Sequence, residues 1–315
     1  MKAGAADLPW RWSLRLPGHR AIALLAVFAA TWALLEGALG TRLEHQYNLM
    51  QVVWWRYAAH LALMLAVWGW RQPGQLWRTR RPVFQLARSL LMLVMPLSFV
   101  AALYVGEHID TVWALFWVTP GLILLVAAMW LNERAPVWLW IATLLGAAGA
   151  VFILEPPLPQ SVPGLLLPLL MALSFSVYVV MTRSLRDEPV VTNLFYTAFG
   201  VFVLLSPLMP SIWLMPSLHD AVYLSAIGVV GFVALWALDR ACESAPVSHT
   251  APTLFFHLGC MMVVGWVFLG EPLTLRVLAG GVMVATIMVG IWWLQPLLVR
   301  NAGTNPVQRG PVRGQ

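Results

Sequence analysis

Apolar residues along this chain come in blocks of about twenty, and short polar stretches separate the blocks. A helix of about 20 residues crosses roughly 30 Å of hydrocarbon, because each residue adds about 1.5 Å. Runs such as Leu122 to Ala128 and Val201 to Leu205 lack the apolar–polar alternation of a membrane β-barrel strand. Helices also satisfy their own backbone hydrogen bonds, which lipid cannot do. The pattern therefore predicts an all-α integral membrane protein.

The blocks predict ten transmembrane helices joined by short loops. We place these helices near residues 20–40, 48–70, 83–105, 109–131, 136–154, 164–183, 191–212, 220–240, 246–269 and 274–295. Residues 1–19 precede the first helix, and no small-residue cleavage pattern follows their basic residues, so we interpret the first apolar block as a retained helix. Residues 296–315, with Gly, Pro, Asn and Arg, are expected to form a disordered tail.

Composition and charge narrow the class of protein. With 60% hydrophobic and only 10% charged residues, the chain carries more apolar surface than a water-soluble core can hide. Its net charge of +6 could suggest nucleic acid, but the arginines lie in short loops and form no single stripe. Most of the 19 Lys and Arg residues fall in alternate loops, while Arg42 and Arg276 alone occupy the opposite loops. The positive-inside rule thus predicts both termini in the cytoplasm, in the inner or plasma membrane.

The two halves of the chain resemble each other. The fourth helix ends in Trp130-Leu-Asn-Glu133 and leads to Pro136, and the ninth ends in Phe268-Leu-Gly-Glu271 followed by Pro272. A span rich in small residues follows each junction. Because five crossings reverse the direction of the chain, the second copy must be inserted upside down. We therefore predict two inverted five-helix repeats, 20–154 and 164–295, the plan of many secondary transporters.

Several motifs occur in the order and spacing of a known family. In the first half they are Arg88-Ser-Leu-Leu, Asp110-Thr-Val-Trp-Ala, Thr119-Pro120, Leu131-Asn-Glu133-Arg134 and Gly146-Ala-Ala-Gly149; in the second, Ser174 to Tyr178, Thr182-Arg183, Ala245-Pro246 and Leu269-Gly-Glu271-Pro272. Together they resemble the EamA repeats of the drug/metabolite transporter superfamily. The resemblance implies a central cavity lined by helices 1 to 4 and 6 to 9, with 5 and 10 outside. One departure is Leu258, at the position matching Pro120.

Ionisable residues inside a span are costly, so they are candidates for function. Arg56 lies well inside the second helix, and His60 lies one turn further on the same face. Arg56 either attracts an anionic or zwitterionic substrate in the cavity or forms a structural pair with Glu36 of the first helix. Arg88 lies near the cytoplasmic end of the third helix, where we expect it to snorkel or to pack structurally, as an ion pair or gate.

Histidine and acidic residues supply further candidates. His257 near the middle of the ninth helix could carry a coupling proton, bond a substrate or simply pack, and His249 is a weaker candidate for the same roles. Glu133 and Glu271 repeat at matching junctions, where we expect each carboxylate to stabilise the start of the next helix. Neither these residues nor Cys242 and Cys260 show the spacing of a metal site or a disulfide framework, and we predict no cofactor.

Aromatic and small residues complete the prediction. Trp117, Tyr178 and Tyr196 are our candidates for the cavity wall, although most of the 18 Trp should face lipid or its interface. The ladder of Ala142, Gly146 and Ala150 allows close helix approach, either within the bundle or in a homodimer formed by helices 5 or 10.

The predicted function is secondary transport of a small polar or amphipathic metabolite. The intramembrane arginines and histidines weakly favour a carboxylate-bearing or zwitterionic substrate. A membrane-embedded enzyme is an alternative, for which His108 with Asp110 or His219 with Asp220 would be the nearest catalytic cluster. A channel is another alternative. No phosphate-binding loop of the ATPase type occurs in the sequence, so ATP hydrolysis by this chain is not expected.

Overall fold

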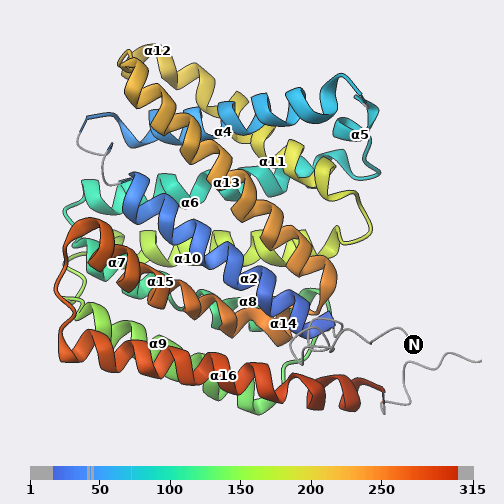
Figure 1. Cartoon of the computed structure of the whole chain (residues 1–315), viewed down its shortest axis with the longest axis vertical. Coiled ribbons are helices and arrows are strands. Elements are labelled where there is room, and N and C mark those ends of the chain that lie inside the picture. The colour runs from blue at the N-terminus through green and yellow to red at the C-terminus, as the bar shows by residue number, and fades with distance from the viewer. Residues whose placement is uncertain (1–16, 41–42, 44–45, 72, 304–315) are drawn as a thin grey trace, which may run out of the picture.

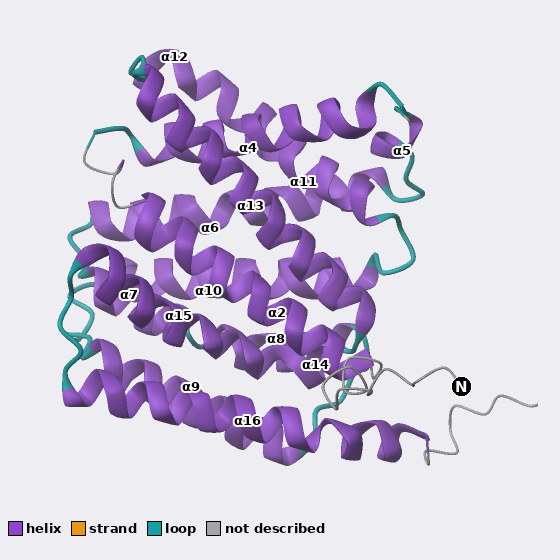
Figure 2. Cartoon of the chain, viewed as in Figure 1, coloured by secondary structure: helices purple, strands orange, loops and turns teal. Residues whose placement is uncertain are grey.

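The computed structural model describes residues 17–40, 43, 46–71 and 73–303. The expectations for residues 1–16, for Arg42 and for the tail from 304 onward lie outside the described residues. All regular secondary structure in the described part is helical (Figure 2). This confirms the predicted all-α class.

The helices follow the predicted spans closely, with breaks inside several of them. In chain order they are α2 (Pro17–Ala33), η1 (Leu34–Gly40), α4 (Leu49–Met64), η2 (Leu65–Gly69), α5 (Gly74–Trp77), α6 (Pro82–Tyr104), α7 (Ile109–Phe116), α8 (Thr119–Trp130), α9 (Val137–Leu154), α10 (Val162–Ser184), α11 (Val190–Leu205), η3 (Ser206–Leu208), α12 (Met209–Ile212), α13 (Leu218–Ser244), α14 (Val247–Thr250), η4 (Ala251–Phe255), α15 (Phe256–Val264), η5 (Gly265–Leu269) and α16 (Leu275–Gly303).

Nine stretches of the described chain are long and apolar enough to cross a membrane. They are Gly18–Gly40, Pro82–Tyr104, Ile109–Trp130, Val137–Leu154, Val162–Ser184, Val190–Ile212, Leu218–Ser244, Val247–Leu269 and Leu275–Leu294. The stretch formed by α4 and η2 has a similar length but carries Gln51, Arg56 and His60. The chain is therefore a multi-pass integral membrane protein.

The long helices lie roughly side by side, and the described chain begins and ends at the same end of the bundle (Figure 1). The most extensive contacts pair α6 with α10 and α2 with α13. Next to them, α13 packs on α4 and α11 packs on α6, while α9 packs on α16 at one side of the molecule. Every one of these pairs joins a helix from the first half of the chain to a helix from the second half, so the two halves are interleaved.

Three spans are interrupted near a proline, and one of them is the seventh, where the 3₁₀ segment η3 contains Pro207. The fourth is divided into α7 and α8 just before Thr119-Pro120, because a proline lacks the amide that would continue the hydrogen-bond ladder. The ninth contains the 3₁₀ segment η4, with Pro252 near its start. Although Leu258 occupies the position matching Pro120, a proline six residues earlier accompanies a break in the second half as well.

Glycines let the outer helices α9 and α16 approach their neighbours. A Cβ atom added at Gly281 would lie 2.7 Å from Met262, and side chains of Phe255 and Met283 lie against Gly146 and Gly149. The small-residue faces are therefore used for packing within the chain, as one of our two alternatives expected. The homodimer stays a prediction.

Both matching junctions end a helix in the same way. Asn132 and Gly270 adopt left-handed backbone conformations, with φ of 55° and 70°. The amides of the next residues, Glu133 and Glu271, donate to carbonyls six residues earlier, at 3.2 and 3.1 Å. The next helices begin only at Val137 and Leu275. Our expectation that these carboxylates stabilise helix starts is therefore wrong, since they belong to the ends of the preceding helices.

Candidate functional site

A cavity of about 500 Å³ lies between the two halves of the chain. Its walls include residues near the ends of η1, α6, α9 and η5 and near the starts of α4, α7 and α16, so it lies toward the left end of the bundle in Figure 1. Its volume falls in the range of about 300–1,000 Å³ that is typical of small-molecule sites. Contrary to the implied lining, Ile153 of α9 and Val277 of α16 contribute, whereas α11 does not.

The cavity lining combines a few charges with large apolar and aromatic walls. Its charged residues are Glu36, Arg56, Asp110 and Glu271; its aromatic residues are Trp32, Phe99 and Trp113; and its methionines are Met92, Met95, Met171, Met261 and Met262. Three carboxylates thus accompany one guanidinium among the described lining residues. Methionine side chains are flexible and polarisable, so such walls adapt to flat and irregular ligands.

Arg56 occupies the cavity wall where α4 meets α2 and α13. Its guanidinium carbon lies 4.7 Å from the ring centre of Tyr57 and 5.6 Å from that of Trp32, which places the charge beside two aromatic faces. Its Nη2 donates to the Tyr57 hydroxyl at 2.7 Å. Gly231 makes room for this side chain, since a Cβ there would lie 3.2 Å from the Arg56 Cδ. The predicted cavity position of Arg56 agrees with this geometry.

Glu36 pairs with a residue other than the one we considered. Its Oε2 lies 3.5 Å from Nε2 of His257, and the structure shows no ion pair between Glu36 and Arg56 in the described chain. The alternative of a structural Glu36–Arg56 pair is therefore wrong. Glu36 lies in η1, a π-helical segment, and such rare segments often mark functional sites.

A second, smaller cavity of about 20 Å³ shares Trp32 and Met95 with the large one. Its lining includes Trp117 and His257, whose ring centres lie 5.5 Å apart. Both residues are buried, and the surrounding side chains are mostly aromatic. The structure therefore brings Trp117 and His257 together near the large cavity, beneath its wall.

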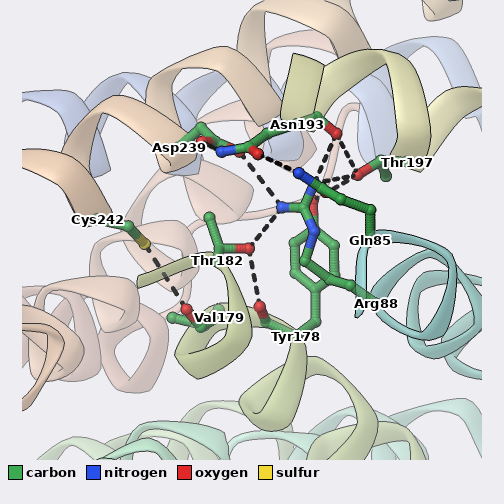
Figure 3. Close-up of polar contacts among 9 residues, drawn as sticks. All are labelled: Gln85, Arg88, Tyr178, Val179, Thr182, Asn193, Thr197, Asp239 and Cys242. Carbon is green, nitrogen blue, oxygen red and sulfur yellow. Dashed lines mark hydrogen bonds and ion pairs between the residues drawn. The ribbon is translucent and has the colours of Figure 1, made fainter. Parts of the chain in front are cut away.

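Away from the cavity, toward the opposite end of the bundle, Arg88 is held in a buried polar network (Figure 3). Its Nη1 donates to Thr182 at 2.9 Å and lies 3.5 Å from Asp239, while Nη2 donates to Gln85, to the carbonyl of Asn193 at 2.5 Å, and to Thr197 at 2.9 Å. The partners come from α6, α10, α11 and α13. Arg88 is 0% exposed, so our expectation that it snorkels is wrong, and the structural ion pair is the reading that agrees with the geometry.

The same end holds a second ion pair between the halves. Nε of Arg183, at the end of α10, lies 2.9 Å from Oε1 of Glu133, and Nη1 donates to the carbonyls of Cys242 and Glu243. The pair ties the junction after α8 to the ends of α10 and α13. The Arg183–Glu133 pair and the Arg88 network are thus two separate sets of polar contacts that hold this end of the bundle together.

Three of the predicted cavity residues lie elsewhere. His60 is buried, with its ring 5.0 Å from that of Phe232, and it does not line the large cavity. Tyr178 lies beside the guanidinium of Arg88, with its ring centre 5.1 Å away. Tyr196 donates to the carbonyl of Trp77 at 3.0 Å on an exposed surface. Helical spacing suggested His60, and aromatic character suggested Tyr178 and Tyr196; neither property indicates which face of a helix turns toward the cavity.

Other residues of the site were missed by the sequence reasoning. Asp110 was considered as part of a family motif and of an enzyme cluster but not as a cavity residue, yet it lines the cavity and pairs with His108 at 3.2 Å. Glu271 was assigned to structure, yet it also lines the cavity. The signal for Asp110 was present, because the residue opens a transmembrane helix. Asn193, which donates to Asp239 at 2.9 Å in the Arg88 network, gave no signal of its own, whereas Asp239 stood out only as an acidic residue at the edge of a predicted span.

Comparisons with known proteins agree with this architecture. Residues 162–293 match the model of the EamA-like transporter family. An S-adenosylmethionine uptake transporter of Rickettsia felis is 26% identical over 234 residues, which are 74% of this chain and 78% of that protein. A riboflavin transporter of Vibrio cholerae is 30% identical over 165 residues, about half of each chain, at 50% and 53%.

A solved protein crystal structure has the same fold. It superposes with a TM-score of 0.74 and covers 90% of this chain and 99% of its own, although only 18% of the residues are identical. The likeness extends well beyond residues 162–293, the part that matches the family model. The arrangement of both halves therefore has a counterpart among known structures.

Proposed function

We propose that this chain, whose residues 162–293 match the EamA-like transporter family, is a transporter of the EamA type in the drug/metabolite transporter superfamily and not an enzyme. The proposal extends to its mode of transport and its substrate class. The chain is a secondary transporter that moves a small zwitterionic, amphipathic metabolite with a flat ring system and a positively charged group. The two halves rock around the cavity to expose it to one side of the membrane at a time. Both termini lie in the cytoplasm.

The pattern of helix contacts supports two inverted repeats of five helices. Exchanging the halves converts the contact of α6 with α10 into that of α13 with α2. The same exchange converts α6 with α11 into α13 with α4, and it maps the pairs α9 with α16 and α4 with α11 onto themselves. The shared geometry of the junctions at Glu133 and Glu271 supports the same relation.

The position of the cavity supports alternating access. It lies at one end of the bundle, while the Arg88 network and the Arg183–Glu133 pair hold the other end together. A transporter open to one side needs this combination, because a substrate must reach the centre from one side only. With both termini in the cytoplasm, the cavity opens outward.

The charged residues that line the cavity are the main support for the proposed substrate class. Arg88 and His60, which had favoured an anion, do not line the cavity, and three carboxylates accompany the single guanidinium of Arg56. Such a lining suits a zwitterion with an excess of positive charge, because buried charges require partners of opposite sign. The Trp and Met side chains supply apolar contact for a ring.

The names of the relatives agree with this chemistry. S-adenosylmethionine, named for the Rickettsia felis protein, combines a sulfonium cation, an amino acid zwitterion and an adenine ring. Riboflavin, named for the Vibrio cholerae protein, has a large flat ring but no cationic group. The charged lining of the cavity favours the first kind of molecule as substrate.

The test is uptake of labelled S-adenosylmethionine into proteoliposomes that contain only the purified protein. We expect exchange against unlabelled S-adenosylmethionine without ATP, and stronger competition from sulfonium compounds than from riboflavin. Arg56→Gln should lower this exchange about tenfold or more, since a desolvated charged contact is worth about 1.5–3 kcal/mol. Arg240→Ala removes an exposed arginine paired with Glu243 and should leave exchange unchanged.

Three results would contradict the proposal. Strict dependence on ATP would exclude secondary transport. Equal competition by riboflavin and by sulfonium compounds would exclude the substrate class. Full exchange by Arg56→Gln would show that the guanidinium is structural.

A further inference from the structure

Two ionisable side chains from opposite halves of the chain meet beside the cavity. His257 belongs to α15 and Glu36 to η1, and their Nε2 and Oε2 atoms lie 3.5 Å apart. His257 is 6% exposed, and neither of its ring nitrogens makes a hydrogen bond to a described residue. Oε2 of Glu36 is buried and likewise makes no hydrogen bond within the described chain. Buried polar groups are normally bonded, so this pair needs an explanation.

Among the residues whose side chains the structure describes, the helices that pack on α15 bring only Glu36 as a charge close to His257. The segments that pack on α15 are α2, η1, η4, η5 and α16. From η1 comes Glu36; η4 and η5 hold no ionisable residue. In α2, His19 and Arg20 lie at the far end of the helix, and His19 contacts the carbonyl of Trp292. Arg276 of α16 pairs with Glu155.

Trp117 places its ring 5.5 Å from that of His257, and Trp32, which lines the small cavity together with His257, lies 5.6 Å from the guanidinium carbon of Arg56. Asp110 and Glu271 also line the large cavity, and Asp110 already pairs with His108. Cys260 is the other ionisable residue of α15. Glu36 is therefore the anion that would accompany a proton on His257.

We propose that His257 and Glu36 together form a proton-binding site that couples transport to protons, an inference that rests on the proposed function. Imidazole is the side chain that ordinarily gains or loses its charge between pH 5 and 8. One proton from water in the cavity binds a ring nitrogen of His257, and the same proton returns to water on the other side of the membrane. No electron or other group is transferred.

Protonation changes the charge at this point of the cavity wall. With neutral His257, the pair carries the single negative charge of Glu36, which is then available to a positive group of the substrate. With protonated His257, the pair is neutral overall and Glu36 is engaged across the interface between the halves. Glu36 lies on η1 and His257 on α15, and these two segments pack on each other. Protonation of His257 therefore changes the electrostatic attraction between the two halves of the chain.

A titration without substrate tests the site itself. Protonated histidine quenches a nearby tryptophan, and Trp117 lies 5.5 Å from His257. In detergent between pH 5 and 9, tryptophan emission of the wild-type protein should show a step that is absent in His257→Gln. His219→Gln, which alters an exposed histidine, should retain it. If the wild-type protein shows no step that depends on His257, the proton site is refuted, whatever the transport assay shows.

Transport into proteoliposomes then tests the coupling, with S-adenosylmethionine as the probe and the membrane potential clamped at zero. For one proton per substrate, each pH unit across the membrane should produce about tenfold accumulation in one direction of the gradient. His257→Gln should lose this accumulation yet retain exchange at equal pH. Wild-type exchange without any response to the gradient would refute the coupling alone, whereas absence of exchange would refute the proposed function.

Discussion

Replacing Arg88 by methionine should destabilise the protein severely, because it leaves the carboxylate of Asp239 buried without its cation. Asp239 is 4% exposed and would keep only the 2.9 Å hydrogen bond from Asn193. Thr182 and Thr197 would retain hydrogen bonds to carbonyls of their own helices, so they contribute little to the loss. Removing one partner of a buried ion pair typically costs about 3–5 kcal/mol.

Thermal unfolding in detergent, followed by tryptophan emission, measures this loss. A destabilisation of that size should lower the melting temperature by on the order of 10 °C. The matched control is the double variant Arg88→Met with Asp239→Asn, which removes both charges and keeps the side-chain volumes. Its melting temperature should return most of the way to the wild-type value, because replacing a buried pair by neutral groups is often nearly neutral in free energy. Equal melting temperatures for the single and the double variant would refute the argument that the unpaired carboxylate causes the loss.

Two further predictions concern packing and orientation. Gly146→Leu should lower stability and α9 should lose its close contact with η4, because the ring of Phe255 lies where the new side chain must go; the same change at Gly290, where a Cβ would meet nothing within 4 Å, should have little effect on the melting temperature. Reporter fusions after Arg81 should indicate the cytoplasm and fusions near Gln160 the outer side, and the reverse pattern would contradict the orientation that we propose.

Much of the fold was predictable because hydropathy and backbone geometry are local properties. The ten predicted segments coincide within a few residues with helical stretches of the structure, including α4 with η2, whose polar residues keep it out of the nine apolar spans. The junctions at Glu133 and Glu271 were recognisable as equivalent from a few letters each. Their role in ending helices was not, because it depends on the backbone conformation of Asn132 and Gly270.

The candidate site was predictable only in part. Arg56, Trp117 and His257 were found because polar or aromatic residues within apolar spans are conspicuous, and the structure places all three on or beside the cavity wall. His60, Tyr178 and Tyr196 had the same appearance in the sequence but face other elements. Hydropathy indicates whether a residue lies in a span, but it does not indicate which neighbouring helix the side chain contacts.

The sequence by itself determined that this chain spans a membrane many times and approximately where its helical segments lie. Tertiary structure alone decided that Arg88 is paired with Asp239, 151 positions along the chain, and that Glu36 meets His257. The physical reason is that a helix fixes the spacing of its own side chains, whereas the charge of a buried group is balanced by whichever helix packs against it. Packing, which is long-range in sequence, therefore sets the cavity and its chemistry.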